Sequence, residues 1–265
     1  MNANTHLESK NDTQKLATRG LRTALGALLA GFVAVAAAGS ADAQVGFNGT
    51  AASCPAGTNI ILGGNFSDTL TGTPGSDCII GADGDDRIDG LGGNDFIAGN
   101  NGNDIIAGGD GADTINAGDG TDQVNGGAGA DVIDGSQGND AILGGGGADT
   151  IQGGEGEDSV DGEGGPDAIN GGPGQDRLAG GAGNDVISGD SGDDRISGGL
   201  GADDIDGGVG QDVLAGDEGN DSLLGGEGDD NLQGGAGNDA LNGGLNNDVC
   251  TDTVGVNTRV SCERS

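Results

Sequence analysis

The sequence predicts an all-β fold in which short parallel strands stack as successive coils of one long solenoid. Three observations support this: a nine-residue period through most of the chain, a glycine content of 63 in 265 residues, and 2% aromatic residues. A chain so rich in glycine, against an average of ~7%, cannot assemble a large apolar core. Collagen is excluded because it needs a three-residue period and abundant proline, and this chain has four prolines. A repeat protein, in which each unit buries its apolar side chain against the next, agrees with all three observations.

The charge of the chain narrows the choice of function. There are 44 acidic and 9 basic residues, which gives a formal net charge of −35. A nucleic-acid-binding protein would carry a basic stripe, so that class is excluded. Two states remain: a disordered polyanion, or a repeat protein in which something other than a core neutralises the acidic side chains.

Residues 1–43 are predicted to be a cleaved secretory signal peptide. Basic residues between Lys10 and Arg22 precede an apolar run from Leu25 to Ala38, and Ala41-Asp42-Ala43 forms a small-x-small cleavage site. The apolar run is shorter than the ~20 residues that span a bilayer, which disfavours the alternative of an uncleaved membrane anchor. We therefore expect a secreted protein, extracellular or periplasmic, that does not associate with the membrane after cleavage.

All four cysteines lie beyond the predicted cleavage site. An even number of cysteines in an exported chain indicates disulfides. Cys54 and Cys78 lie near one end and Cys250 and Cys262 near the other. This spacing favours the pairs Cys54–Cys78 and Cys250–Cys262, although four cysteines allow three connectivities.

Residues 63–251 form 21 consecutive nonamers of the pattern G-G-x-G-x-D-x-U-x, without an insertion or deletion. The position-six aspartate recurs from Asp68 to Asp248, and position eight is a branched aliphatic residue in every copy except the last, where it is Cys250. Positions seven to nine alternate, which predicts a three-residue strand with position eight pointing inward. Glycine-rich positions one to six predict a turn, and the prolines of the repeats are expected there. These prolines are Pro74, Pro166 and Pro173.

Stacking follows from this unit, because one nonamer cannot bury its aliphatic side chain alone. Two nonamers make a flattened coil of 18 residues, so the repeats predict about ten coils and a stack of roughly 50 Å at ~4.8 Å per strand. Residues 44–62 and 252–265 are expected to be N-terminal and C-terminal caps that protect the strand edges of the end coils.

The aspartates predict a metal. Carboxylates 18 residues apart would lie roughly 5 Å apart in neighbouring coils, which is strongly repulsive at low dielectric. Ca²⁺ takes six or more oxygen ligands, carboxylates and backbone carbonyls alike, whereas Mg²⁺ requires stricter geometry and Zn²⁺ or copper favours histidine and thiolate. Calcium between successive coils therefore fits the residues best.

The nonamers of residues 63–251 resemble the RTX (repeats-in-toxin, hemolysin-type) calcium-binding repeat. The resemblance implies a right-handed parallel β-roll, in which position-six aspartates and turn carbonyls of two successive coils form each site, for up to about 19 Ca²⁺ ions. Position four departs from the pattern at Phe66 and Asn246, which leaves Asp68 and Asp248 out of the implied set. The implied ligands are Asp77, Asp86, Asp95, Asp104, Asp113, Asp122, Asp131, Asp140, Asp149, Asp158, Asp167, Asp176, Asp185, Asp194, Asp203, Asp212, Asp221, Asp230 and Asp239.

The sequence thus predicts a secreted calcium-binding repeat protein that folds on binding Ca²⁺ and is disordered without it. The alternative is an extracellular structural or adhesive rod with a cell-surface or matrix partner. An enzyme is not expected, because the chain beyond residue 43 has no histidine and no long loops to form a cleft. Ice binding would favour ranks of threonine, whereas successive position-seven residues are mixed: Arg87, Phe96, Ile105, Thr114 and Gln123.

Overall fold

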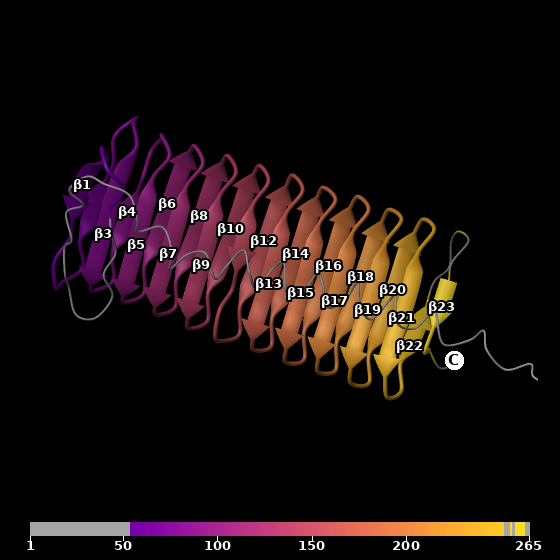
Figure 1. The fold of residues 1–265 in the computed structure, drawn as a ribbon. Helices are drawn as coiled ribbons and strands as arrows, with labels where there is room; N and C mark the ends of the chain where they lie inside the picture. The colour runs from indigo at the N-terminus through magenta and orange to yellow at the C-terminus, as the bar shows by residue number, and fades with distance from the viewer. Residues whose placement is uncertain (1–53, 252–254, 256–257, 263–265) are drawn as a thin grey trace, which may run out of the picture. The chain divides into compact units, whose positions relative to one another are not determined.

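The computed structural model describes residues 54–251, 255 and 258–262, and every element in this part of the chain is a β-strand. The strands form two parallel sheets that face each other along a stack of coils (Figure 1). The predicted signal peptide lies outside the described residues, as do parts of the two flanking segments. No helix among the residues described is long and apolar enough to cross a membrane.

Consecutive strands alternate between the two sheets. The 12-stranded sheet, called here the odd sheet, comprises β1 (Asn59–Leu62), β3 (Asp77–Asp83), β5 (Phe96–Asn101), β7 (Thr114–Asp119), β9 (Val132–Gln137), β11 (Thr150–Gln152), β13 (Ala168–Pro173), β15 (Val186–Ser191), β17 (Asp204–Val209), β19 (Ser222–Glu227), β21 (Ala240–Leu245) and β23 (Thr258–Val260). The 11-stranded sheet, called the even sheet, comprises β2 (Thr69–Thr71), β4 (Arg87–Asp89), β6 (Ile105–Asp110), β8 (Gln123–Ala128), β10 (Ala141–Gly146), β12 (Ser159–Gly164), β14 (Arg177–Ala182), β16 (Arg195–Leu200), β18 (Val213–Glu218), β20 (Asn231–Ala236) and β22 (Val249–Thr251).

The strands pair in a constant register of one coil. Ile133 of β9 is opposite Ile151 of β11, 18 residues later. This confirms the predicted parallel solenoid. The stack has about 11 coils, slightly more than the repeats alone predict, because β1 and β23 continue the same register beyond the nonamers at each end.

Most strands are longer than the three residues predicted from positions seven to nine. They run on through position three of the next nonamer, as in the six-residue strand β6. The N–H of Asp110, at position three, donates to the carbonyl of Leu91 one coil below at 3.0 Å. The expectation that every proline lies in a turn is therefore wrong for Pro173, the last residue of β13. Its carbonyl still accepts the N–H of Gly156 at 3.0 Å.

The core is the predicted aliphatic column. Position-eight side chains from Ile79 to Leu241 are at most 3% exposed, and Cys250 closes the column at 4%. They form one continuous cluster. Because each nonamer contributes a single such side chain, the core is long but narrow.

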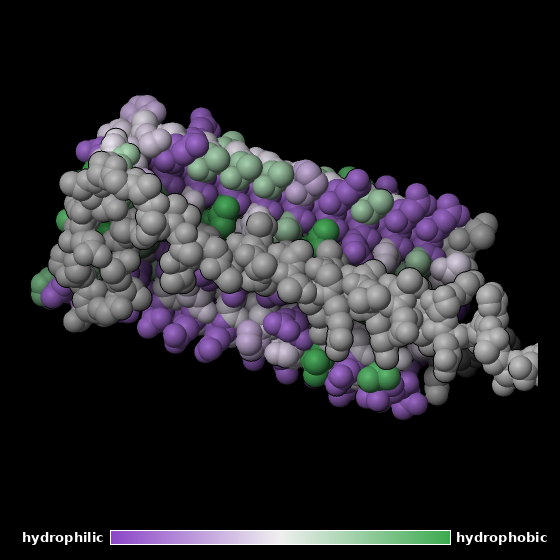
Figure 2. Space-filling model, in the orientation of Figure 1, coloured by the Kyte–Doolittle hydropathy of each residue, from purple (hydrophilic) through white to green (hydrophobic). Residues whose placement is uncertain are grey.

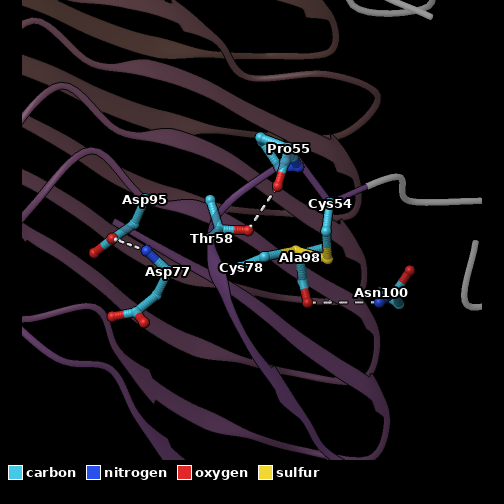
Figure 3. Close-up of a disulfide and its surroundings, with 8 residues drawn as sticks. All are labelled: Cys54, Pro55, Thr58, Asp77, Cys78, Asp95, Ala98 and Asn100. Atoms are coloured by element: carbon cyan, nitrogen blue, oxygen red, sulfur yellow. Dashed lines mark hydrogen bonds between the residues drawn. A yellow bond between two sulfur atoms is a disulfide. The ribbon is translucent and has the colours of Figure 1, made fainter. Parts of the chain in front are cut away.

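A disulfide lies at each end of the stack, in the pairing that the spacing favours. Cys54 and Cys78 have Cα atoms 5.6 Å apart (Figure 3), and Cys250 and Cys262 have Cα atoms 5.7 Å apart. Cys78 occupies position seven, an outward position, yet it is fully buried. The reason is local, since Cys54 and Phe96 cover it in a small second cluster.

The two sheets present different outward faces. Position seven of the odd sheet is uncharged from Cys78 to Val186, whereas the even sheet carries Arg87, Arg177 and Arg195 at this position. The mixed order along the sequence arises because consecutive nonamers alternate between sheets. The two turn edges differ as well: Figure 2 shows a row of pale green residues among purple ones along part of the upper edge, whereas the lower edge is mainly purple and hydrophilic.

Candidate metal centre

The position-six aspartates form two ladders, one along each turn edge. Every one from Asp77 to Asp248 is at most 3% exposed, although a carboxylate is among the groups least often buried without a partner. Asp68, in the first nonamer, is half-buried. Within a ladder the aspartates are 18 residues apart, so each belongs to the coil directly above the previous one.

One carboxylate oxygen of each ladder aspartate joins two coils. The backbone N–H of Asp95 donates to Oδ1 of Asp113 at 2.8 Å, and the N–H of Asp104 donates to Oδ1 of Asp122 at 2.7 Å. The same bond recurs from Asp68, at 2.7 Å, to the last pair ending at Asp248, at 3.1 Å. Each carboxylate is therefore held in a fixed position beneath the turn of its own coil.

The second carboxylate oxygen has no such partner. Oδ2 of the position-six aspartates from Asp86 to Asp230, and of Asp248, is buried and accepts no hydrogen bond from the described residues. A buried, ionised oxygen without a donor is costly, of the order of several kcal/mol, unless a cation or donor compensates it. The ladders thus have the donor chemistry of a cation site.

Glycine at position one leaves room for this oxygen. A Cβ on Gly216 would lie 2.4 Å from Oδ2 of Asp221 and 2.5 Å from the carbonyl oxygen of Gly234, one coil above. The carboxylate oxygen and the carbonyl oxygen therefore both lie next to the glycine Cα, in the space that a side chain would fill. Position one is glycine in every nonamer except one, where it is Ala117. A carboxylate oxygen beside a backbone carbonyl is an oxygen-only set that suits Ca²⁺.

Backbone oxygens are needed, because side chains alone do not complete a site. No group of three aspartate, glutamate, histidine or cysteine side chains in the described part of the chain could hold a metal ion. A cation between coils would be bound by carboxylates together with turn carbonyls, which is the arrangement expected from the sequence. The residues present therefore fit calcium and do not fit a metal that requires nitrogen or sulfur.

The pKa values of most ladder aspartates are raised in the protein without a counter-ion. Burial, opposed by the hydrogen bond from the coil below and reinforced by carboxylates of adjacent coils, raises the pKa of Asp104, Asp140 and Asp176 to about 7. At neutral pH these groups are near half-ionisation in the protein alone. A bound cation would favour the ionised form.

The N-terminal end of the ladder differs from the sequence-based expectation. Both oxygens of Asp77 are satisfied by the protein: Oδ1 accepts the Asn59 side-chain amide at 2.8 Å, and Oδ2 accepts the N–H and hydroxyl of Thr73 at 2.6 and 3.0 Å. Burial acts to raise the pKa of Asp77, but these hydrogen bonds outweigh it and the pKa is lowered. Figure 3 shows Asp77 beside Asp95, its partner one coil above.

At the C-terminal end of the ladder, the structure adds a candidate ligand that the resemblance does not imply. The resemblance does not imply Asp248 as a ligand, because Asn246 replaces the position-four glycine. Asn246 adopts a φ of 82°, in the left-handed region that asparagine tolerates, so the turn keeps its shape. Asp248 consequently has the same buried geometry as the internal aspartates.

Position five carries a second ladder that the sequence reasoning missed. Oδ1 of Asn94 accepts the N–H of Ala112 at 3.1 Å, and Oδ1 of Asn139 accepts the N–H of Glu157 at 3.0 Å. Each bond joins the turns of adjacent coils and holds their backbone in register. Asparagine, aspartate or serine at position five is the signal that could have identified it.

Comparison with known proteins adds the following. A family model described as the RTX calcium-binding nonapeptide repeat matches the chain in successive, partly overlapping segments, namely residues 62–97, 98–133, 116–151, 134–169, 143–178, 152–187, 179–214 and 215–250. Comparison with curated proteins gives no match. Among solved structures, the chain is similar to a hyperactive, Ca²⁺-dependent, β-helical antifreeze protein from an Antarctic bacterium, with 18% identity, coverage of 74% of this chain and 80% of that chain, and a TM-score of 0.47.

Proposed function

The chain belongs to the RTX calcium-binding nonapeptide repeat family, and from this premise we propose that it is an exported rod whose coils fold as they bind Ca²⁺ along both turn edges. The observation that carries the proposal is the pair of ladders in which buried carboxylates keep one oxygen without a hydrogen-bond donor. A divalent cation supplies the missing positive charge without requiring a further side chain.

The proposed ligands are the position-six aspartates from Asp86 to Asp239, together with Asp248. Asp77 does not belong to the proposed set, although the resemblance implies it, because Asn59 and Thr73 already satisfy its carboxylate. A backbone carbonyl of the coil above would complete each pair of oxygens, from position one within the nonamers and from Ser261 above Asp248. The expected number of ions stays at up to about 19.

Charge supports coupling between binding and folding. Beyond residue 43 the chain has a net charge of −36, and about 19 divalent ions would carry a comparable positive charge. Without these ions, repulsion between the carboxylates opposes folding, while the core that favours folding contains only one aliphatic side chain per nonamer. The free energy of calcium binding is then part of the free energy of folding, as in small metal-dependent domains.

Export is supported by two features of different kinds. The predicted signal peptide would direct the chain out of the cytosol, and the disulfides Cys54–Cys78 and Cys250–Cys262 require an oxidising compartment. A compartment with abundant calcium, extracellular or periplasmic, would allow folding only after export. The alternative role, a structural or adhesive rod at the cell surface, uses the same calcium-stiffened stack, and no catalytic activity is proposed for either role.

Circular dichroism during a calcium titration tests the proposal, with calorimetry to count the ions. We expect a cooperative gain of β-structure and a stoichiometry well above ten ions per chain. Mg²⁺ at the same concentration is the control and should produce little folding. A chain that is fully folded at pH 7.5 in excess chelator, or that binds only one or two ions, would contradict the proposal.

A further inference from the structure

Two arginines lie side by side on the outward face of the even sheet. Arg177 of β14 and Arg195 of β16 occupy position seven of successive coils and are register partners. Both side chains are exposed. Adjacent parallel strands are ~4.8 Å apart, so the two guanidinium groups can reach the same point above the sheet.

This arrangement is unfavourable for the isolated protein. Like charges directly opposite each other on neighbouring strands destabilise a sheet. The chain has 44 acidic residues, yet neither arginine forms an ion pair with any carboxylate that the structure describes. Among the described residues, the positive pair is therefore left without a counter-ion.

Three acidic side chains of the same region accept hydrogen bonds from groups other than the two arginines. Oδ1 of Asp193, in the turn before Arg195, accepts the N–H of Gln211 at 2.9 Å. Asp217 accepts the hydroxyl of Ser197. Asp161 of β12 accepts the backbone N–H two residues further along the chain at 2.9 Å. None of these three hydrogen bonds involves an arginine, and neither guanidinium group pairs with a described carboxylate, so both are available to a group from outside.

The neighbouring side chains leave the pair open to solvent. Beside Arg177 and Arg195 on the same face, position nine is occupied by Ala179 and Ser197, which are small and half-buried. A guanidinium group donates two parallel N–H bonds to an oxyanion, and two adjacent groups can bind the same one. We propose that Arg177 and Arg195 form a binding site for an oxyanion, a sulfate or a carboxylate group, on the even sheet.

The site depends on the proposed function, because the arginines are 18 residues apart and meet only when the coils are stacked. Calcium also matters electrostatically, since neutralisation of the aspartate ladders removes the field that would repel an anion. The test therefore uses the calcium-loaded full chain, and calcium-induced folding is measured separately for each variant.

Sulfate titration followed by NMR of the arginine Nε–H signals tests the site, at constant ionic strength because exposed charges are screened by salt. We expect the signals of Arg177 and Arg195 to shift saturably with one common dissociation constant. Arg87 is the matched control, because it is exposed at position seven of the same sheet but its register partners are Thr69 and Ile105. Its signal should shift only weakly and without saturation. A parallel titration with acetate tells a carboxylate from a sulfate preference.

Two substitutions make the test decisive. Arg195→Gln should weaken sulfate binding at Arg177 by up to about fivefold, since one of the two surface ion pairs to the anion is lost. Arg87→Gln should leave that binding unchanged. Equal, non-saturating shifts at all three arginines with both anions, or unchanged affinity in Arg195→Gln, would overturn the proposal. An unsubstituted chain that does not fold with calcium would instead contradict the proposed function.

Discussion

Replacement of one ladder aspartate should change stability in opposite directions with and without calcium. Asp176 lies in the middle of the stack, where its Oδ1 accepts the N–H of Asp158 at 2.8 Å and its Oδ2 is buried without a donor. In Asp176→Asn the amide oxygen can keep the hydrogen bond, while an NH₂ group replaces Oδ2. The substitution therefore removes one charge and one candidate calcium ligand and leaves the backbone contact in place.

The expected changes in the free energy of unfolding differ between the calcium-free and the calcium-loaded protein. Burial is the main cause that raises the pKa of Asp176, from 3.8 to about 7, and the carboxylates of Asp194 and Asp158 add to it. Keeping this group ionised at pH 8 costs at most about 4 kcal/mol, and about 2 kcal/mol once neighbouring carboxylates share the proton and water screens them. Calcium-free Asp176→Asn should gain that amount. In calcium at about 100 times the dissociation constant, loss of one ion removes ~2.7 kcal/mol, which outweighs the calcium-free gain of about 2 kcal/mol and leaves a net loss of about 1 kcal/mol.

Urea unfolding at pH 8, followed by circular dichroism, measures both effects. The calcium-free arm contains chelator and trimethylamine oxide, an osmolyte that favours the folded state. Asp193→Asn is the matched control, because Asp193 is exposed at the adjacent position five and its Oδ1 accepts the N–H of Gln211. The control should be near neutral in both arms. Destabilisation of Asp176→Asn in both arms, or equal behaviour of the two variants, would refute the reasoning.

Four further outcomes are expected. Because the pKa values of the ladder aspartates are raised in the folded state, the calcium-free fold is favoured at low pH and loses stability as pH rises through about 6 to 7. Circular dichroism in chelator should therefore show structure increasing from pH 8 to pH 4. Loss of structure on acidification would contradict this expectation. Ala117→Gly removes the one position-one Cβ and should strengthen calcium binding by a few-fold in calorimetry, whereas an unchanged isotherm would mean that the methyl group is accommodated. Cys262→Ser opens the loop closed by Cys250, of sequence separation 12, and should cost about 3 kcal/mol and speed hydrogen exchange in β23 while the middle coils stay protected. Ile169→Ala, in the buried column, should lower the calcium-loaded free energy of unfolding by 2–5 kcal/mol in urea, and a loss below ~1 kcal/mol would argue against a close-packed column.

The periodic part of the molecule could be predicted from sequence, because its causes are periodic. A single aliphatic side chain every nine residues defines the register, and the buried column from Ile79 to Leu241 follows from it. Strand length could not be predicted in the same way. Positions one and two are mostly glycine and position three varies, so these positions carry no side-chain pattern, although the backbone of positions two and three pairs between most coils.

The ends could not be predicted, because their contacts are made by residues outside the repeat. Asn59 lies before the first nonamer, yet it satisfies the carboxylate of Asp77 and so removes a ligand that the pattern implies. Cys54 likewise buries Cys78 at a position that faces solvent elsewhere. Whether Oδ2 of a ladder aspartate lacks a hydrogen-bond donor depends on the orientation of its carboxylate. Spacing along the sequence does not define that orientation.

The alternation of nonamers between two sheets makes 18 residues the unit in which this molecule can lengthen or shorten. Loss of one whole coil would shorten the stack by one strand spacing, ~4.8 Å, and leave every later residue on its own sheet and edge. Loss of a single nonamer would preserve the core and the aspartates equally well, but it would transfer every later side chain to the opposite face. Arg177 and Arg195 would then continue the uncharged face of the odd sheet, and the turns of the two edges would exchange places. The aliphatic column is thus indifferent to a change of nine residues, whereas any function carried by one face permits only changes of eighteen.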